Sequence, residues 1–320
     1  MAAILSESSW RAWYSAARPR TLTATLAPLA LAGVMALDHE VFDGPVFALA
    51  LFGALLLQVA TNLINEYADW QRGTDRYKQA GQGMTIKQGV LPARSVGVGA
   101  LLSLGGAVLV GLLLLAREGP DLLASPLLWI GAGGVLVAVA YTAGPLPLSR
   151  LGLGEVAVGI FMGPLMVLGA WYVQARCLTW QVMLASLPLA LMVAAILHAN
   201  NLRDMEADRA VGKRTLAVRF GWRAARAEYL LLVSGSYILL LLLVVSGDIP
   251  WPALLALLTL PEALQLQRQV LATTEVSTLH VVQGRTARLH GRFGGALALG
   301  WLLAALAGAG SAPLPPTLCM

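Results

Sequence analysis

The stretch "ATNLINEYAD", residues 60–69, starts in an apolar segment and ends in carboxylates, and a near copy, "ANNLRDMEAD", occupies residues 199–208. Each copy closes an apolar segment that enters a basic loop. One offset aligns the polar positions, pairing Asn62 with Asn201, Asn65 with Asp204 and Asp69 with Asp208. The chain therefore contains a pseudo-repeat whose repeated feature is a polar face at the end of a helix.

Helical spacing places the polar side chains of each copy on one face, because residues three and four apart are neighbours on a helix surface. The first stripe is Asn62, Asn65, Glu66 and Asp69, and the second is Asn201, Asp204 and Asp208, with His198 one turn earlier. Buried, unpaired carboxylates inside a membrane cost several kcal/mol each. Both stripes are therefore expected to face a cavity and to be neutralised by cations.

The surrounding chain has the composition of a multi-span membrane protein. Of its 320 residues, 58% are hydrophobic and 12% are charged, and the mean hydropathy of +0.71 excludes an ordinary soluble domain. Nine apolar segments match or approach the ~20 residues that an α-helix needs to cross a bilayer: 21–37, 45–65, 95–116, 127–143, 156–175, 180–201, 229–247, 249–266 and 293–311. The eighth is interrupted by prolines and is the weakest. The sequence predicts an all-α membrane protein with nine transmembrane helices.

Basic residues set the orientation, since lysine and arginine accumulate in cytoplasmic loops. With nine spans and a cytoplasmic N-terminus, only Arg117 and Arg176 of the 22 lysines and arginines fall outside. We therefore expect one integral-membrane domain over 1–320, with a cytoplasmic segment at 1–15, the C-terminus outside and a short tail at 312–320. The expected location is a bacterial cytoplasmic membrane, with the site toward the cytoplasm and the first span kept as an anchor.

Oxygen ligands on two helices favour Mg²⁺ over zinc or iron, because Mg²⁺ prefers hard oxygen donors. The two separate cysteines, Cys177 and Cys319, support neither a disulfide framework nor a zinc site. The candidate metal ligands are Asn65, Glu66, Asp69, Asp75, Asp204 and Asp208. Since Mg²⁺ usually completes its octahedron with water and substrate phosphate oxygens, a diphosphate is the expected partner.

Basic residues flank both stripes, with Arg72, Lys78 and Lys87 after the first and Arg203, Lys213 and Arg214 around the second. Charge-assisted hydrogen bonds from such residues would hold the phosphate oxygens that the metal does not. The net charge of +5 is thus a consequence of orientation and of a bound anion, and no pattern suggests nucleic acid.

At these residues the sequence resembles the UbiA superfamily of intramembrane prenyltransferases. "NEYADWQRGTD" is similar to the family's N-D-x-x-D-x-x-x-D motif, with Glu66 replacing an aspartate and the last acid displaced to Asp75, and "NNLRDMEADRAVGKRTLAVRFG" contains its D-x-x-x-D motif. Similarity continues in "AARPRTLTATLAPLALAG" (16–33) and "YTAGPLPLSRLGLGEVAVGIFMGPLMVLGAWY" (141–172). The resemblance covers nearly the whole chain and is strongest to the 1,4-dihydroxy-2-naphthoate polyprenyltransferases of menaquinone synthesis.

This resemblance implies nine helices around a central cavity that opens sideways to lipid. It also implies Mg²⁺-dependent transfer of a polyprenyl group from polyprenyl diphosphate to an aromatic acceptor, with two metal ions and loss of the acceptor's carboxylate as carbon dioxide. Asp69 and Asp208 would act through the metal, and Tyr141 would line the pocket of the allylic cation. The residues expected to bind substrate are Asn62, Arg72, Lys78, Tyr141, Arg150, His198, Asn201, Arg203 and Lys213.

Several alternatives remain open from the sequence. A lone histidine on a helix face, such as His198, is more often a satisfied core residue than a base. Carboxylates in a repeat also occur in cation-coupled or proton-coupled transporters, and a Mg²⁺-dependent scaffold is a third reading. Within the family, 4-hydroxybenzoate, homogentisate, haem and chlorophyll precursors are other acceptors, and the prenyl chain length is not legible.

Overall fold

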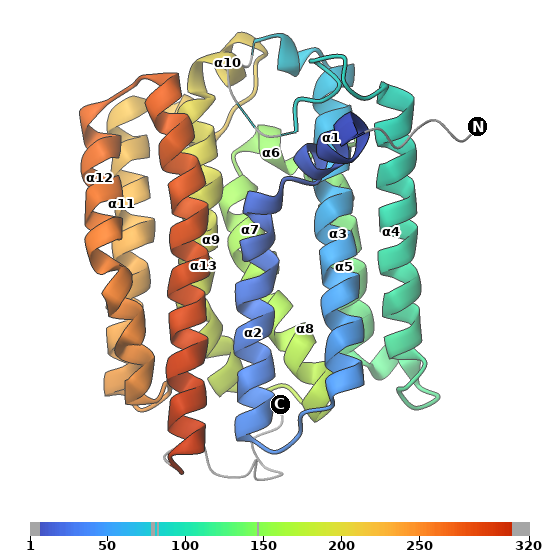
Figure 1. Ribbon diagram of the computed structural model, residues 1–320, viewed down its shortest axis with the longest axis vertical. Coiled ribbons are helices and arrows are strands. Elements are labelled where there is room, and N and C mark those ends of the chain that lie inside the picture. Colours follow the sequence, from blue (N-terminus) through green and yellow to red (C-terminus); the bar gives the residue numbers. More distant parts are fainter. Residues whose placement is uncertain (1–6, 78–80, 82, 146, 309–320) are drawn as a thin grey trace.

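The computed structural model describes residues 7–77, 81, 83–145 and 147–308, and these form helices joined by turns. The long helices stand side by side as one bundle (Figure 1). In chain order the α-helices are α1 (Glu7–Ala17), α2 (Thr23–Asp38), α3 (Gly44–Gln71), α4 (Ala93–Leu115), α5 (Pro126–Ala140), α6 (Leu148–Leu151), α7 (Gly154–Met162), α8 (Pro164–Ala175), α9 (Trp180–Arg203), α10 (Met205–Ala210), α11 (Leu216–Val245), α12 (Leu260–Ala272) and α13 (Val276–Leu306). Short 3₁₀ helices are η1 (Pro19–Leu22), η2 (Thr74–Arg76), η3 (Leu122–Ala124) and η4 (Trp251–Thr259).

Seven helical stretches are long and apolar enough to cross a membrane. They are η1 with α2, α3, α4, α7 with α8, α9, α11 and α13. The prediction of an all-helical chain with many membrane-crossing helices is confirmed to that extent. Of the other two predicted spans, α5 is shorter, at 15 residues, and 249–266 is divided between η4 and α12. Pro252 and Pro261 explain that division, since proline lacks the amide hydrogen that a helix interior needs.

Several helices extend beyond their predicted apolar segments. The helix α13 starts 17 residues before position 293, and α11 starts at Leu216 rather than 229. Both extensions contain several charged residues, so a hydropathy pattern alone does not detect these helical turns. The predicted N-terminal segment 1–15 includes most of α1, whereas the predicted tail 312–320 lies outside the described residues.

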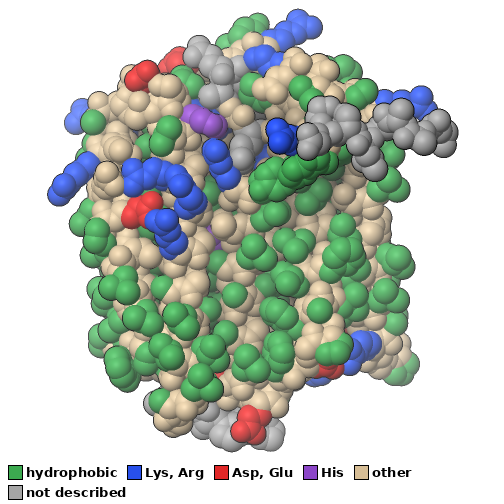
Figure 2. Space-filling view, viewed as in Figure 1, with side chains coloured by type: hydrophobic (Ala, Val, Ile, Leu, Met, Phe, Trp, Pro, Cys, Tyr) green, Lys and Arg blue, Asp and Glu red, His purple; other side chains and the backbone are tan. Residues whose placement is uncertain are grey.

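Charge is distributed unequally between the two ends of the bundle. On the face shown in Figure 2, lysine and arginine gather mainly toward the end that carries α10, and hydrophobic side chains cover most of the remainder. At the opposite end, the Arg117 Nη2 atom lies 3.3 Å from Asp43 Oδ2, and Arg176 forms an ion pair with Glu118. The two arginines that the sequence placed outside are therefore paired with carboxylates.

The most enclosed helix is α9, which contacts α7, α8, α11 and α13. Its small and aliphatic side chains are buried along much of its length, including Ala185, Leu189 and Ala195. Close packing of this kind holds the helix in one orientation. The second polar copy, at the end of α9, is therefore held rigidly.

A prediction concerns the contact between α13 and η4. A β carbon at Gly300 would overlap the backbone of Pro252 and Ala253, lying 2.5 Å from the Ala253 Cα. We expect Gly300→Ala to lower the free energy of unfolding by about 1–3 kcal/mol through overpacking. Thermal unfolding in detergent measures the change.

The control is Gly295→Ala on the same helix, where an added β carbon meets nothing within 4 Å. That variant should gain up to about 1 kcal/mol of helix propensity. Equal unfolding midpoints for the two variants would contradict the close approach of η4.

Candidate active site

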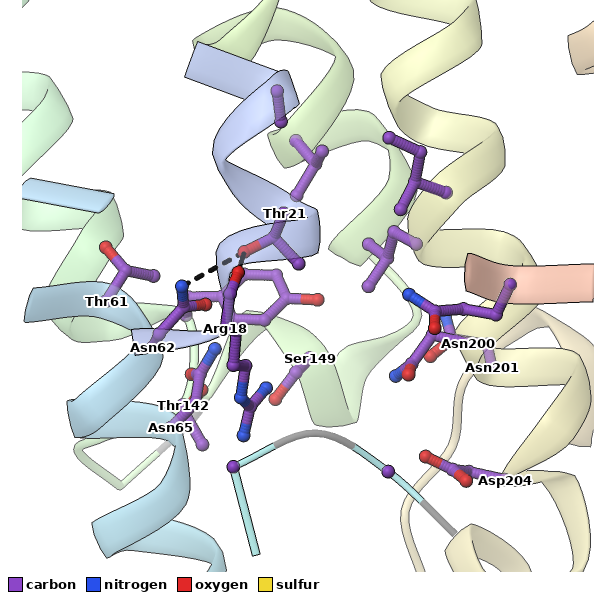
Figure 3. A pocket seen from close by; sticks show the side chains of 18 of the residues that line it. Arg18, Thr21, Thr61, Asn62, Asn65, Thr142, Ser149, Asn200, Asn201 and Asp204 are labelled. Carbon is purple, nitrogen blue, oxygen red and sulfur yellow. Dashed lines mark hydrogen bonds between the residues drawn. The ribbon is translucent and has the colours of Figure 1, made fainter. Parts of the chain in front are cut away.

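A polar cavity of about 170 Å³ lies between α3 and α9. Figure 3 shows side chains from these two helices on opposite sides of it, with Arg18 reaching between them. From α3 the lining residues include Thr61, Asn62, Asn65 and Asp69, and from α9 and its end they include Asn200, Asn201, Arg203 and Asp204. The two copies of the pseudo-repeat thus face one another across a single cavity.

The chemistry of the cavity wall changes with depth, and the change goes further on the α9 side than on the α3 side. Along α3 the lining runs from Asp69 through Asn65 and Asn62 to Gln58, in steps of three or four residues. Along the second copy it runs from Asp204 through Asn201 to Leu197 and Val193. Each step is one helical turn of about 5.4 Å. Carboxylates therefore occupy one end of both walls and amides come next, and on the α9 wall apolar side chains follow.

The spacing predicted that the second copy lies on one regular helix, but the structure divides it between two helices. Helix α9 ends at Arg203, Asp204 has φ −93° and ψ 7°, and α10 begins at Met205. Arg203 donates to both oxygens of its neighbour Asp204, at 2.7 and 2.6 Å. This fork holds the Asp204 carboxylate at the bend.

Asp208 is fully buried and pairs with Lys213, whose Nζ lies 3.0 Å from Oδ2. Lys213 lines the cavity, while Asp208 is not among the described lining residues. The lysine therefore lies between the carboxylate and the cavity, and both acids of the second stripe, Asp204 and Asp208, are matched by a cation from their own segment.

The first copy offers oxygen atoms suited to a hard cation. The Asn65 Oδ1 atom is buried and has no hydrogen-bond partner among the described residues. Asp69, one turn away, lines the same cavity. A buried amide oxygen without a partner is unfavourable, and a divalent ion would satisfy it. Asn65, Asp69 and Asp204, which line the cavity, accordingly fit Mg²⁺, whereas Asp208 is held by Lys213.

Two other predicted ligands have different surroundings. Glu66 accepts hydrogen bonds from the Thr85 hydroxyl at 2.6 Å and the Ile86 amide at 3.0 Å. It thereby holds the loop after the first motif against α3. Asp75 is buried in a separate hollow that Lys87 also lines. Neither acid is among the described residues that line the cavity.

Two predicted substrate-binding arginines bind backbone carbonyls instead. Arg72 donates to the carbonyls of Thr142 and Gly144, the second at 2.9 Å. Arg150 donates to the Val211 carbonyl at 2.6 Å. The two guanidinium groups therefore hold the segments after α5 and α10 by hydrogen bonds. Lys78 lies outside the described residues, and Arg214 is exposed.

Tyr141 follows the last residue of α5 and lines the cavity. Its hydroxyl is close to Gly154, since a β carbon on that glycine would lie 3.2 Å from it. His198, in contrast, is fully buried and does not line the cavity. Its ring nitrogens lie 3.1 Å from Glu155 Oε1 and 2.7 Å from the Ala225 carbonyl.

The sequence analysis missed Arg18 and Glu155. Arg18 lines the cavity and has a positive φ of 54°, which is uncommon for a residue with a side chain. Its Nε atom is buried and has no hydrogen-bond partner among the described residues. The only sequence signal was its place in the "ARPRT" opening, where an arginine also serves orientation. Glu155, directly before the apolar segment 156–175, was a detectable acid at the end of a predicted span.

An apolar cavity of about 560 Å³ lies among α3, α4, α5, α7 and α8. Leu57 and Phe161 in its wall are the chain neighbours of Gln58 and Met162 in the polar cavity. Glycines and alanines such as Gly53, Ala54 and Gly134 leave its space open. The two cavities therefore share walls on α3 and α7.

A prediction separates Asp69 from Glu66. We expect Asp69→Asn to weaken the binding of Mn²⁺, a paramagnetic substitute for Mg²⁺, at least about tenfold. Electron paramagnetic resonance titration measures the affinity. Glu66→Gln should leave the affinity unchanged but speed amide hydrogen exchange in residues 84–91, because the loop loses a charged acceptor. A loss of affinity in Glu66→Gln alone would make Glu66 the ligand.

Comparison with known proteins supplies an independent line of information. A model of the UbiA prenyltransferase family matches residues 26–280. The chain is 33% identical over 298 residues to the 1,4-dihydroxy-2-naphthoate octaprenyltransferase of Bacillus subtilis, covering 93% of this chain and 94% of that protein. It is 36% identical over 263 residues to the Mycobacterium tuberculosis protein of the same name, covering 81% and 85%.

Solved structures resemble the fold at lower identity. A UbiA homolog from Aeropyrum pernix K1 aligns with a TM-score of 0.62 and 18% identity, covering 86% of this chain and 97% of that one. A UbiA homolog from Archaeoglobus fulgidus bound to DMAPP and Mg²⁺ aligns with a TM-score of 0.54 and 14% identity, covering 90% and 99%. At these identities the similarity concerns the fold.

Proposed function

This chain belongs to the UbiA prenyltransferase family, and we propose that it transfers a polyprenyl group from polyprenyl diphosphate to 1,4-dihydroxy-2-naphthoate, with loss of carbon dioxide. It is an integral membrane enzyme that transfers prenyl groups. The observation that carries the proposal is the cavity between the two acid-ended copies, which changes from charged to apolar with depth. The names of its bacterial relatives support the same acceptor and a role in menaquinone synthesis.

Mg²⁺ fits the donor set, and in our proposal two ions are held by Asn65, Asp69, Asp204 and Asp208. When bound, such ions withdraw charge from the leaving diphosphate oxygen. The structure of the Archaeoglobus homolog bound to DMAPP and Mg²⁺ supports the use of a divalent cation. Glu66 and Asp75 would act without touching the metal, by holding the loops after the first motif.

The diphosphate would be held by Arg18, Arg203 and Lys213, which line the cavity. In the structure Arg203 and Lys213 pair with Asp204 and Asp208. A divalent ion that neutralises these carboxylates would free both cations for phosphate oxygens. The proposal thus links metal binding to diphosphate binding, with Lys78 as a further contact from the loop.

The reaction forms one carbon–carbon bond and breaks two bonds. The allylic C–O bond breaks with its electron pair on the diphosphate, and the ring carbon that carries the carboxylate attacks the prenyl carbon. Loss of that carboxylate as carbon dioxide returns an electron pair to the ring, so no oxidant is needed. In our proposal the two carbons meet beside Tyr141 and the amide side chains, which line the same cavity as the apolar side chains that would exclude water.

The apolar cavity would hold the prenyl chain. Its wall is built from aliphatic side chains and glycines, and it borders the polar cavity at Leu57 and Phe161. A hydrocarbon chain gains free energy by leaving water for such a surface. The diphosphate would then lie at the carboxylate end and the chain at the apolar end.

We further propose that the nine predicted segments all cross the membrane as a single domain. The N-terminus and the site would face the cytoplasm of a bacterial cell. The accumulation of lysine and arginine at the end with α10 supports this orientation. The ion pairs of Arg117 and Arg176 at the other end reduce the cost of placing them outside.

The test is turnover by purified protein given octaprenyl diphosphate, 1,4-dihydroxy-2-naphthoate and Mg²⁺. We expect a prenylated, decarboxylated naphthoquinol whose formation stops with EDTA. Asp69→Ala and Asp208→Ala should lower turnover at least about 100-fold. Glu206→Ala is the matched control, because Glu206 is exposed and pairs only with Arg209 among the described residues.

Each other outcome has a defined meaning. Diphosphate release without this product would keep the prenyl transfer but assign another aromatic acceptor. Failure to consume any polyprenyl diphosphate would contradict the proposed reaction.

A second prediction tests the place of the prenyl chain. Gly134 lines the apolar cavity, and a β carbon there would lie 3.8 Å from Leu57. Gly134→Leu should fill this space and lower kcat/KM for octaprenyl diphosphate about tenfold, while geranyl diphosphate is used as before. Gly105→Leu, where nothing lies within 4 Å of an added β carbon, is the control. An equal loss with both donors would contradict the assignment.

A further inference from the structure

Glu155 forms a buried polar cluster directly behind the cavity wall. It lies in the first turn of α7 and is only 4% exposed. Its Oε1 atom accepts a hydrogen bond from Asn201 Nδ2 at 2.7 Å and lies 3.1 Å from His198 Nδ1. Glu155 itself is not among the described residues that line the cavity. The cluster thus reaches the cavity only through Asn201.

This contact decides which end of the Asn201 amide faces the carboxylate. An ionised carboxylate only accepts hydrogen bonds, so the amide nitrogen must face Glu155. The amide oxygen is then on the other side of the group, and none of the described residues donates to it. Because Asn201 lines the cavity, this oxygen is the polar atom available to a ligand.

His198 holds Glu155 in place. The Ala225 carbonyl also only accepts, so His198 Nε2, 2.7 Å away, carries a hydrogen. The ring orientation is thereby set, and Nδ1 also carries a hydrogen, as an imidazolium, and donates it to the ionised Glu155. Glu228 Oε1 lies 3.5 Å from the same nitrogen. The histidine therefore joins α9 to α7 and α11 around the carboxylate.

The other copy of the pseudo-repeat has the same arrangement with different partners. Asn62, which aligns with Asn201, donates from Nδ2 to the Ala17 carbonyl at 2.9 Å. The same nitrogen donates to the Thr21 hydroxyl at 3.1 Å (Figure 3). In this copy too, the amide nitrogen donates to protein acceptors, and the amide oxygen remains for a ligand. The orientation is thus set independently on both sides of the cavity.

The amide oxygen of Asn201 restricts the kind of ligand group that can bind beside it. A carbonyl oxygen repels phosphate and carboxylate but accepts a hydrogen bond from a hydroxyl group. Asn201 lies one turn deeper than Asp204, away from the carboxylates that fit the metal. A phenolic hydroxyl that donates a hydrogen bond increases electron density in its ring, which assists attack on an allylic cation.

We propose that Glu155, held by His198, is a positioning residue that orients Asn201 so that its amide oxygen accepts a hydrogen bond from a hydroxyl group of the aromatic acceptor. The inference rests on the proposed function and adds the contact that recognises the acceptor. Asn201 is the residue that touches substrate, and Glu155 acts through it.

The test compares three kinetic constants in Glu155→Gln. A glutamine side chain of the same size can donate as well as accept, so the amide of Asn201 is no longer held in one orientation. We expect the KM for the dihydroxynaphthoate acceptor to rise about tenfold. The KM for the prenyl diphosphate and the Mg²⁺ concentration for half-maximal rate should not change. Glu228→Gln is the control, since Glu228 faces His198 without touching Asn201.

A reversed pair distinguishes positioning from a general loss of structure. In Glu155→Gln/Asn201→Asp, glutamine donates to aspartate, and the second aspartate oxygen is left for the ligand. We expect the acceptor KM in this double variant to recover most of the loss seen in either single variant. No recovery, or a parallel rise in the donor KM, would overturn the positioning role. An inactive wild-type protein would instead contradict the proposed function, so the two failures are distinguishable.

Discussion

A buried carboxylate must be compensated, and this requirement organises the polar part of the bundle. Each acid of the second copy has its own cation, Arg203 for Asp204 and Lys213 for Asp208. Deeper in the bundle, Glu155 is matched by His198 and Asn201. The same rule holds at the other end, where Glu118 meets Arg176. A divalent ion at the cavity would replace protein cations that are then available to an anionic substrate, so charge compensation connects the protein's internal ion pairs to the chemistry.

The helical repeat arranges the cavity lining so that its polarity changes with depth. Because α3 and α9 present residues in steps of one turn, carboxylates and then amides occupy successive depths on both walls, and apolar groups follow on the α9 wall. A prenyl diphosphate likewise has a charged group at one end and a hydrocarbon chain at the other. The apolar space among α3, α4, α5 and α8 continues that order. The geometry therefore suits a substrate that enters with its charge at one end and its hydrocarbon in the bundle.

The type of a residue and its place in the sequence did not predict its contacts in the folded chain. Arg72 and Arg150 were expected at phosphate, but helix ends and turns leave carbonyls that need donors, and these arginines bind Thr142, Gly144 and Val211. Glu66 lies in the predicted stripe, yet loop residues 85 and 86 bond its carboxylate. Such outcomes depend on which loop packs beside a helix, and local spacing contains no information about that packing.

The sequence by itself determined the membrane character, the helical class, the family and the pairing of the two polar copies, because hydropathy, periodicity and motif spacing are properties of neighbouring residues. Only the tertiary structure decided which side chains share the cavity. It brought Arg18 into the cavity from the first turns of the chain and placed Glu155 behind Asn201. The physical reason is that these contacts join residues far apart in the chain, and helix packing alone brings such residues within hydrogen-bonding distance.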